Sequence, residues 1–194
     1  MKKKGKIPYE KNKLYVILSI VCVFVGFSLL YTATTEEKKE ISYLHADYPQ
    51  YDHAEDIVNA ANLAFSGKVV GVRYEELNIA NEEENYLTGY HEESPLIPYT
   101  IYTIQTDQVY KGEIENNTIE IKRLGGELDG VNYVLDEYTP IEEGDSYLFL
   151  ATTYPSGYPS LVNTTQGAYS LEQEQANKNA SIELNDILNL LQNK

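Results

Sequence analysis

The side chains best suited to binding or reaction gather in one stretch, residues 75–98, with the sequence EELNIANEEENYLTGYHEESPLIP. Seven of these residues are Glu, and two Tyr and one His stand among them. Tyrosine offers a large contact area at a low cost in conformational entropy, and clustered carboxylates attract basic partners. We therefore predict that the stretch binds a basic protein or a cell-envelope component. The predicted partner-binding residues are Glu82, Glu83, Glu84, Tyr86, Tyr90 and His91. The alternative is a disordered acidic insertion.

Carboxylates in flexible loops are also the ligands that Ca²⁺ prefers, because this ion takes six to eight hard oxygen atoms. Two sets of residues are candidates: Glu82, Glu83 and Glu84 with Glu92 and Glu93, and Asp129 with Asp136 and Glu137. Neither set has the D-x-[DN]-x-[DN]-G spacing of a known calcium loop. A Ca²⁺-dependent extracellular module is the alternative function, and a solvated acidic loop explains the same residues more simply.

Motifs for catalysis are missing from the sequence. It has no G-x-S-x-G elbow, no phosphate-binding G-x-x-x-x-G-K-[ST] loop and no H-E-x-x-H. The segment Gly144-Asp145-Ser146 resembles the start of a GDSL-type hydrolase block, but such enzymes need a His late in the chain, and all three His come earlier. We therefore predict a protein that is not an enzyme and uses no cofactor. An envelope hydrolase with paired carboxylates is a weaker alternative, since such pairs act only at a fixed spacing.

The N-terminal segment predicts a membrane anchor. Residues 1–13 form a basic tail with six Lys, and the 18 uncharged residues 14–31 are long enough to cross a bilayer. A cleaved signal peptide is the alternative, but it has a shorter apolar core, and Tyr31 stands where its cleavage site needs a small residue. The positive-inside rule then predicts a cytoplasmic N-terminus and places residues 32–194 outside the membrane.

Charge divides at the same boundary. Residues 1–31 carry net +5, whereas residues 32–194 carry nine basic and 29 acidic groups, net −20. A part this acidic is repelled by phosphate backbones, so we predict no nucleic-acid partner. The whole chain has a single Cys, Cys22, which lies in the apolar segment. One Cys excludes a disulfide framework or a Cys-based zinc site.

Hydrophobic periodicity predicts the elements that must position these residues. A polar linker is expected over 32–52, followed by a short helix over 53–61 with Asp52 as its cap. Strands are then expected over 63–74, 99–110, 118–124, 146–152, 161–162 and 168–171. Bulges or sharp bends are expected at Gly67 and Gly71, and a bulge near Asp107. Within the strand over 118–124, Ile119 and Ile121 are expected to face inward, and Glu120 and Lys122 outward.

Beyond the strands, residues 173–194 are expected to hold a C-terminal amphipathic helix, capped by Ser181, that packs on the barrel. These elements predict a mainly β fold, a small antiparallel OB-like barrel over 53–172 with flanking helices, preceded by one transmembrane helix.

Four segments carry a family resemblance: FSGKVVGV, VYKGEIENNTIEIKRLGG, EEGDSYLFLATTY and TQGAY. In this order and spacing they resemble extracytoplasmic proteins of Gram-positive bacteria, most of them uncharacterised, which pair an N-terminal anchor with an OB-fold-like domain. The likeness covers residues 54–171 and implies a fold but no catalytic residue. The barrel type is similar to the netrin-like domain of tissue inhibitors of metalloproteinases. Those proteins chelate metal through an N-terminal Cys, which residues 32–194 lack.

The sequence thus predicts a membrane-anchored, extracytoplasmic binding or adaptor module that acts through its acidic loop.

Overall fold

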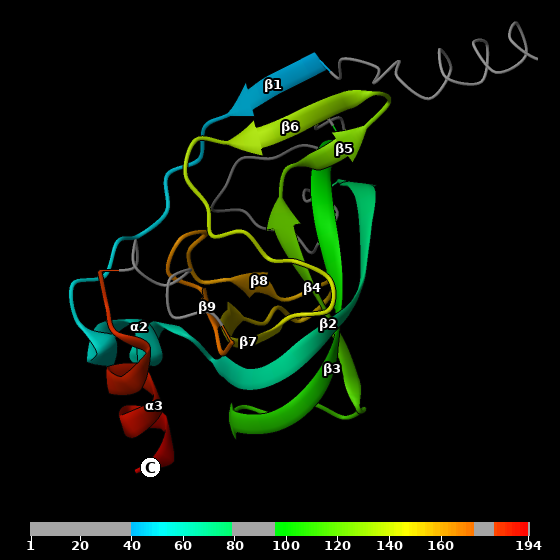
Figure 1. The fold of residues 1–194 in the computed structure, drawn as a ribbon. Coiled ribbons are helices and arrows are strands. Elements are labelled where there is room, and N and C mark those ends of the chain that lie inside the picture. Colours follow the sequence, from blue (N-terminus) through cyan, green and yellow to red (C-terminus); the bar gives the residue numbers. More distant parts are fainter. Residues whose placement is uncertain (1–39, 79–95, 173–180, 194) are drawn as a thin grey trace, which may run out of the picture. The chain divides into compact units, whose positions relative to one another are not determined.

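The computed structural model describes residues 40–78, 96–172 and 181–193 (Figure 1). The predicted basic tail, the anchor over 14–31 and the six predicted partner-binding residues from Glu82 to His91 lie outside the described residues. Within the described ranges, no helix is both long and apolar enough to cross a membrane. The described elements are β1 Glu40–Leu44, α2 Ala54–Ala60, β2 Leu63–Leu77, β3 Ile97–Lys111, β4 Thr118–Leu124, β5 Gly126–Leu128, β6 Val131–Leu135, β7 Ser146–Thr152, β8 Ser160–Leu161, β9 Ala168–Ser170 and α3 Leu184–Gln192.

Five strands close into a barrel, which confirms the predicted mainly β fold. Their order is β2-β3-β4-β8-β7, and a further pairing of β7 with β2 closes the ring. All neighbours are antiparallel except β4 and β8, which run parallel. The short β9 pairs with the half of β7 that β8 leaves open.

The two long strands β2 and β3 bend because bulges interrupt their pairing. The register of the pair shifts between Ser66 and Gly67, where Asp107 is skipped, and again between Val69 and Gly71. A side chain at Gly67 would place its Cβ 2.5 Å from the carbonyl oxygen of Gln105, so only glycine fits there. The predicted bulges at Gly67, Gly71 and Asp107 are confirmed. They let both strands take part in the barrel and then extend beyond it (Figure 1).

Alternating residues of β7 serve two hydrophobic cores, as its nearly continuous apolar sequence predicts. Phe149 points into the barrel, where its ring stacks on Phe65 with centroids 5.2 Å apart. Leu148 and Leu150 face the other way, toward the helices. Both faces of β7 are therefore buried, which is typical of a central strand.

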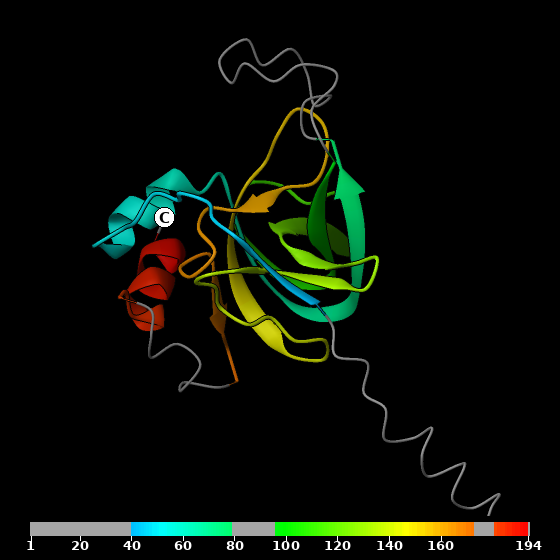
Figure 2. The ribbon, with the colours of Figure 1, turned by 90° about the horizontal axis from the view of Figure 1, so that it is seen from above.

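The helices α2 and α3 pack beside each other on one side of the barrel (Figure 2). Ile57 of α2 and Ile187 of α3 are fully buried there, as expected from the helical spacing. The predicted caps are wrong: His53 and Glu183 occupy the N-cap positions, and neither side chain makes a capping hydrogen bond. The hydroxyl of Ser181 instead accepts a hydrogen bond from Gln166, because tertiary contacts compete for the same group.

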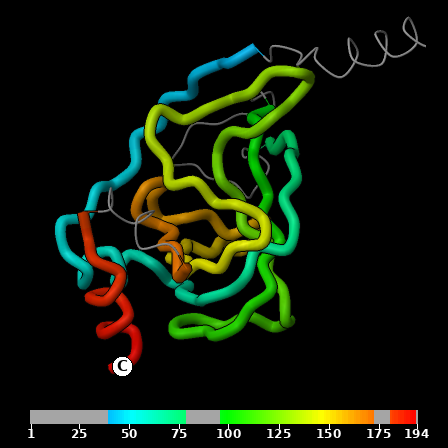
Figure 3. The backbone as a smooth tube through the Cα atoms, viewed as in Figure 1, coloured from blue at the N-terminus to red at the C-terminus, as the bar shows by residue number. Residues whose placement is uncertain are grey.

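A second, three-stranded sheet β1-β6-β5 differs from the sequence prediction. Its strand β1 lies in the segment predicted as a polar linker and pairs in parallel with β6 (Figure 3). The exposed side chains of Ile41 and Tyr43 explain why the sequence did not indicate a buried strand. Strands β5 and β6 form a hairpin whose turn residues Asp129 and Gly130 both have positive φ, 49° and 80°. Residues 40–52 therefore belong to the folded unit.

Candidate functional site

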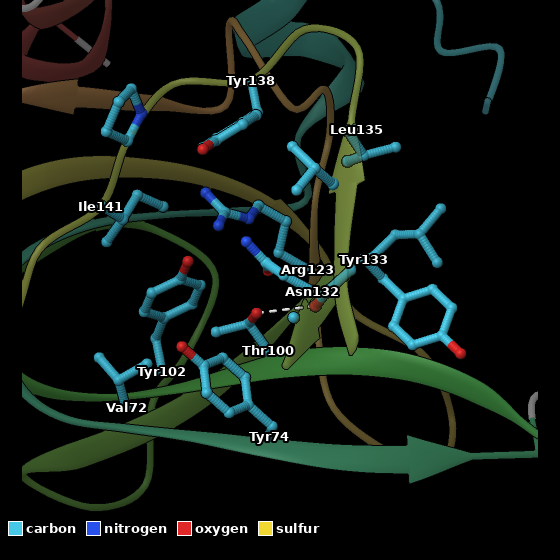
Figure 4. A pocket seen from close by; sticks show the side chains of 15 residues that line it. Val72, Tyr74, Thr100, Tyr102, Arg123, Asn132, Tyr133, Leu135, Tyr138 and Ile141 are labelled. Atoms are coloured by element: carbon cyan, nitrogen blue, oxygen red, sulfur yellow. Dashed lines mark hydrogen bonds between the residues drawn. The ribbon is translucent and has the colours of Figure 1, made fainter. Parts of the chain in front are cut away.

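A cleft lies between the inner face of β2, β3 and β4 and the β5–β6 hairpin (Figure 4). Strand register builds its floor, because Tyr74, Thr100 and Arg123 stand directly opposite one another on three neighbouring strands. One step further into the barrel, Val72 stands opposite Tyr102. Side chains that are level on neighbouring strands share a face, so this inner row is fixed by the pleat of the sheet.

The hairpin supplies the opposite wall and approaches the floor closely. The hydroxyl of Thr100 donates a hydrogen bond of 2.7 Å to the carbonyl oxygen of Gly125. Gly126 has φ 144°, and a Cβ there would lie 2.6 Å from the ring of Tyr74. Glycine is thus required both by backbone conformation and by contact. The remaining wall residues are Leu124, Asn132, Tyr133, Val134, Leu135, Tyr138, Pro140 and Ile141.

Arg123 is the only charged side chain among the 15 residues that line the cleft. Its guanidinium carbon lies 4.7 Å from the ring centroid of Tyr138 and 5.2 Å from that of Tyr102. One of its nitrogens donates a hydrogen bond of 3.0 Å to the carbonyl oxygen of Thr139. The two rings and this bond hold the guanidinium in place, and Figure 4 shows it pointing into the cleft.

The chain has only two arginines, and they differ in their partners. Arg73, on the outer face of β2, makes two hydrogen bonds to the carboxylate of Glu120, at 2.5 and 3.1 Å, and one to the hydroxyl of Tyr158. This pairing raises the pKa of Arg73 and lowers that of Glu120. Arg123 has no carboxylate partner among the residues that the structure describes. Arg73 therefore forms a structural ion pair with Glu120, whereas the guanidinium of Arg123 faces the cleft.

The lining of the cleft is mainly aromatic and apolar, with one charged side chain. Burial raises the pKa of Tyr102 to about 12, although the charge of Arg123 acts in the opposite direction. The hydroxyl of Tyr102 is therefore neutral and serves as a hydrogen-bonding group. The lining residues include no Asp, Glu, His, Lys or Cys. What the cleft offers a ligand is aromatic surface, the amide of Asn132 and one guanidinium.

The outer face of the same strands carries a second cation. Lys122 was predicted to face outward, and only 5% of its surface is exposed. Its ammonium lies 5.0 Å from the ring centroid of Tyr154 and 5.6 Å from that of Tyr99. Tyr154 belongs to the connection from β7 to β8, which the sequence could not place over β4. Lys122 does face outward, but this connection covers it.

The candidate calcium ligands after residue 96 are not brought together. Asp129 lies in the turn before β6, whereas Asp136 follows its other end and pairs with His45. In the described ranges, no three His, Cys, Asp or Glu side chains could jointly hold a metal ion. The hydrolase-like segment is a turn, since Gly144 has φ 98° and Asp145 accepts a backbone hydrogen bond from Val69.

The cleft was missed at the sequence level. The sequence did not mark Tyr102, Arg123, Asn132 or Tyr138 as members of one site. The available signal was Arg123 itself, a cation at an inward-facing position of β4 in a very acidic chain. No protein-family model matches the chain, and neither does any curated protein. The fold and the cleft alone define it as a small β-barrel protein with a tyrosine-lined cleft at the mouth of the barrel.

Proposed function

We propose that this chain is a membrane-anchored, extracytoplasmic binding module without catalytic activity, and that the tyrosine-lined cleft is its ligand site. The observation that carries the proposal is the guanidinium of Arg123, held between two aromatic rings and facing a cleft. A guanidinium fixed in this way is costly to desolvate without a partner, so a polar ligand is the natural occupant. The predicted anchor over 14–31 and the six lysines before it support the location.

The barrel is of the OB type in this proposal. Numbered along the chain, its strands follow the order 1-2-3-5-4-1, with the third and fifth strands parallel. The resemblance to anchored proteins with an OB-fold-like domain agrees with this order. Barrels of this type bind ligands on their second and third strands and on neighbouring loops, and they include oligosaccharide-binding proteins.

The cleft has a volume of about 270 Å³, close to the lower end for ligand pockets. It is therefore suited to one ring or one side chain of a larger envelope component. Tyr74 of the cleft directly precedes residue 75, where the predicted acidic stretch begins. A partner that contacts this loop would be near the cleft as well, so both features fit one binding surface.

The experiment is capture of solubilised envelope polysaccharides and proteins by the full-length chain. A polyoxyethylene detergent is used because it has no sugar headgroup to compete. Tyr138→Ala should weaken capture at least tenfold, since it removes an exposed aromatic face and one side of the Arg123 support. The matched control is Tyr43→Ala, which removes an exposed tyrosine of β1 that does not line the cleft.

Unchanged capture by a folded Tyr138→Ala variant would refute the assignment of the cleft. Deletion of residues 79–95 tests the predicted loop separately. Loss of capture on deletion, with full capture by Tyr138→Ala, would place the binding surface in the loop alone.

A further inference from the structure

The charge of the cleft is opposite to that of the chain around it. Residues 32–194 carry net −20, and yet none of the cleft's lining residues is acidic. Arg123 therefore gives the cleft a local positive charge inside a negative surrounding field. Among the residues that the structure describes, no carboxylate forms an ion pair with Arg123. Its positive charge is therefore available to an anionic group of the ligand.

The guanidinium is also preorganised for a planar oxyanion. Tyr102 and Tyr138 support it, and the bond to Thr139 uses one of its five N–H donors. The remaining donors form the fork that matches two carboxylate oxygens, and little conformational entropy is lost when a ligand binds.

We propose that the cleft recognises an acidic sugar residue of a uronic-acid type, with the sugar carboxylate on Arg123 and the sugar ring against exposed tyrosine. This inference rests on the proposed function and names its ligand class. Tyr74 and Tyr138, 49% and 40% exposed, provide the aromatic faces, and Asn132 provides an amide for ring hydroxyls.

A single negative charge fits this site better than a more highly charged group. One guanidinium neutralises one carboxylate, whereas a phosphate monoester carries about −1.5 to −2 at pH 7 and would be left with excess charge in an acidic surrounding. Polyphosphate chains are repelled for the same reason. The small volume of the cleft limits recognition to one residue of a polysaccharide.

The test is calorimetric titration of the full-length chain with galacturonic acid and with its methyl ester. The two probes share one sugar ring and differ by a single negative charge. We expect the acid to bind at least tenfold more tightly than the ester, and the difference to shrink as salt rises from 0.15 to 0.5 M. Arg123→Gln should remove the preference for the acid. Arg123→Lys, which keeps the charge but not the fork, should retain only part of it.

Arg73→Gln is the matched control, because it removes the other arginine from the outer face and should leave the preference unchanged.

Equal affinity of the wild-type chain for acid and ester overturns the inference but leaves the proposed binding site in place. Binding of neither probe, together with envelope capture that Tyr138→Ala abolishes, also overturns it and keeps the proposed function. Captured envelope material can also be displaced from the chain with small anions. If inorganic phosphate displaces it more strongly than galacturonate does, the assignment to a carboxylate is overturned. If the wild-type chain captures no envelope material, the proposed function itself is refuted.

Discussion

Replacing Tyr169 by Phe is expected to stabilise the protein. Tyr169 of β9 is fully buried, and its hydroxyl has no hydrogen-bond partner among the residues that the structure describes. A buried hydroxyl without a partner costs about 1–3 kcal/mol of folding free energy. Removing the oxygen leaves a gap of about 10–15 Å³, roughly one water-sized sphere. At about 24 cal/mol per Å³ this gap costs roughly 0.3 kcal/mol. The net gain in the free energy of unfolding is therefore about 1 kcal/mol or more.

Tyr147 of β7 provides the matched comparison, because it is equally aromatic and only 3% exposed. Its hydroxyl accepts a hydrogen bond of 3.0 Å from the backbone N–H of Glu142. Tyr147→Phe leaves this donor without its partner and should lower the free energy of unfolding by about 1 kcal/mol. The two substitutions delete the same atom from neighbouring strands, yet they should have opposite signs.

Urea unfolding of the full-length chain, followed by far-UV circular dichroism, measures both effects through the transition midpoint. In a thermal melt, the change for each variant corresponds to about 3 °C for a unit of this size. If Tyr169→Phe lowers the free energy of unfolding by about 1 kcal/mol or more, the hydroxyl of Tyr169 has a hydrogen-bond partner. The reasoning from its burial would then be wrong.

Three further predictions concern ionisation, a helix terminus and the helix layer. Burial raises the pKa of Tyr102 from 10.0 to about 12, so its proton is lost first in the unfolded chain. Stability should therefore fall by about 2 kcal/mol between pH 10 and 12, and Tyr102→Phe should flatten the pH dependence of the urea midpoint. Lys111 donates hydrogen bonds to the carbonyl oxygens of Val58 and Ala61 at the end of α2; Lys111→Met should lower the urea-derived free energy of unfolding by about 1–2 kcal/mol, and no change would contradict this capping role. Ile187→Ala should destabilise by about 2–5 kcal/mol and speed amide exchange in α3 before the barrel strands, whereas uniform exchange would show that α3 and the barrel unfold together.

Local patterns predicted the barrel well, because strand pairing here follows hydrophobic alternation. The sequence of β7 is apolar on both faces, and the structure buries Leu148 and Phe149 on opposite sides. Glycine and parity likewise predicted the bulges near Gly67 and Asp107, since a pleated strand cannot keep one face inward across them without an extra residue.

Strand β1 and the helix caps could not be predicted, because distant partners decide them. Tyr43 is 64% exposed, so β1 has no apolar face to indicate it, and its pairing with β6 depends on backbone hydrogen bonds. Ser181 is a favourable capping residue, but Gln166 uses its hydroxyl. The covering of Lys122 by Tyr154 also depends on where a distant connection lies.

The sequence by itself determined the barrel strands, the bulges, the amphipathic helix and the acidic character of the chain, because each depends on residues close together along the chain. Tertiary structure alone decided the cleft. Tyr74, Thr100 and Arg123 come from three strands, and only the register of those strands makes them neighbours. Register follows from bulges, turns and burial acting together. The cleft that Arg123 lines therefore exists only in the folded chain, where the hairpin of β5 and β6 lies opposite the barrel strands.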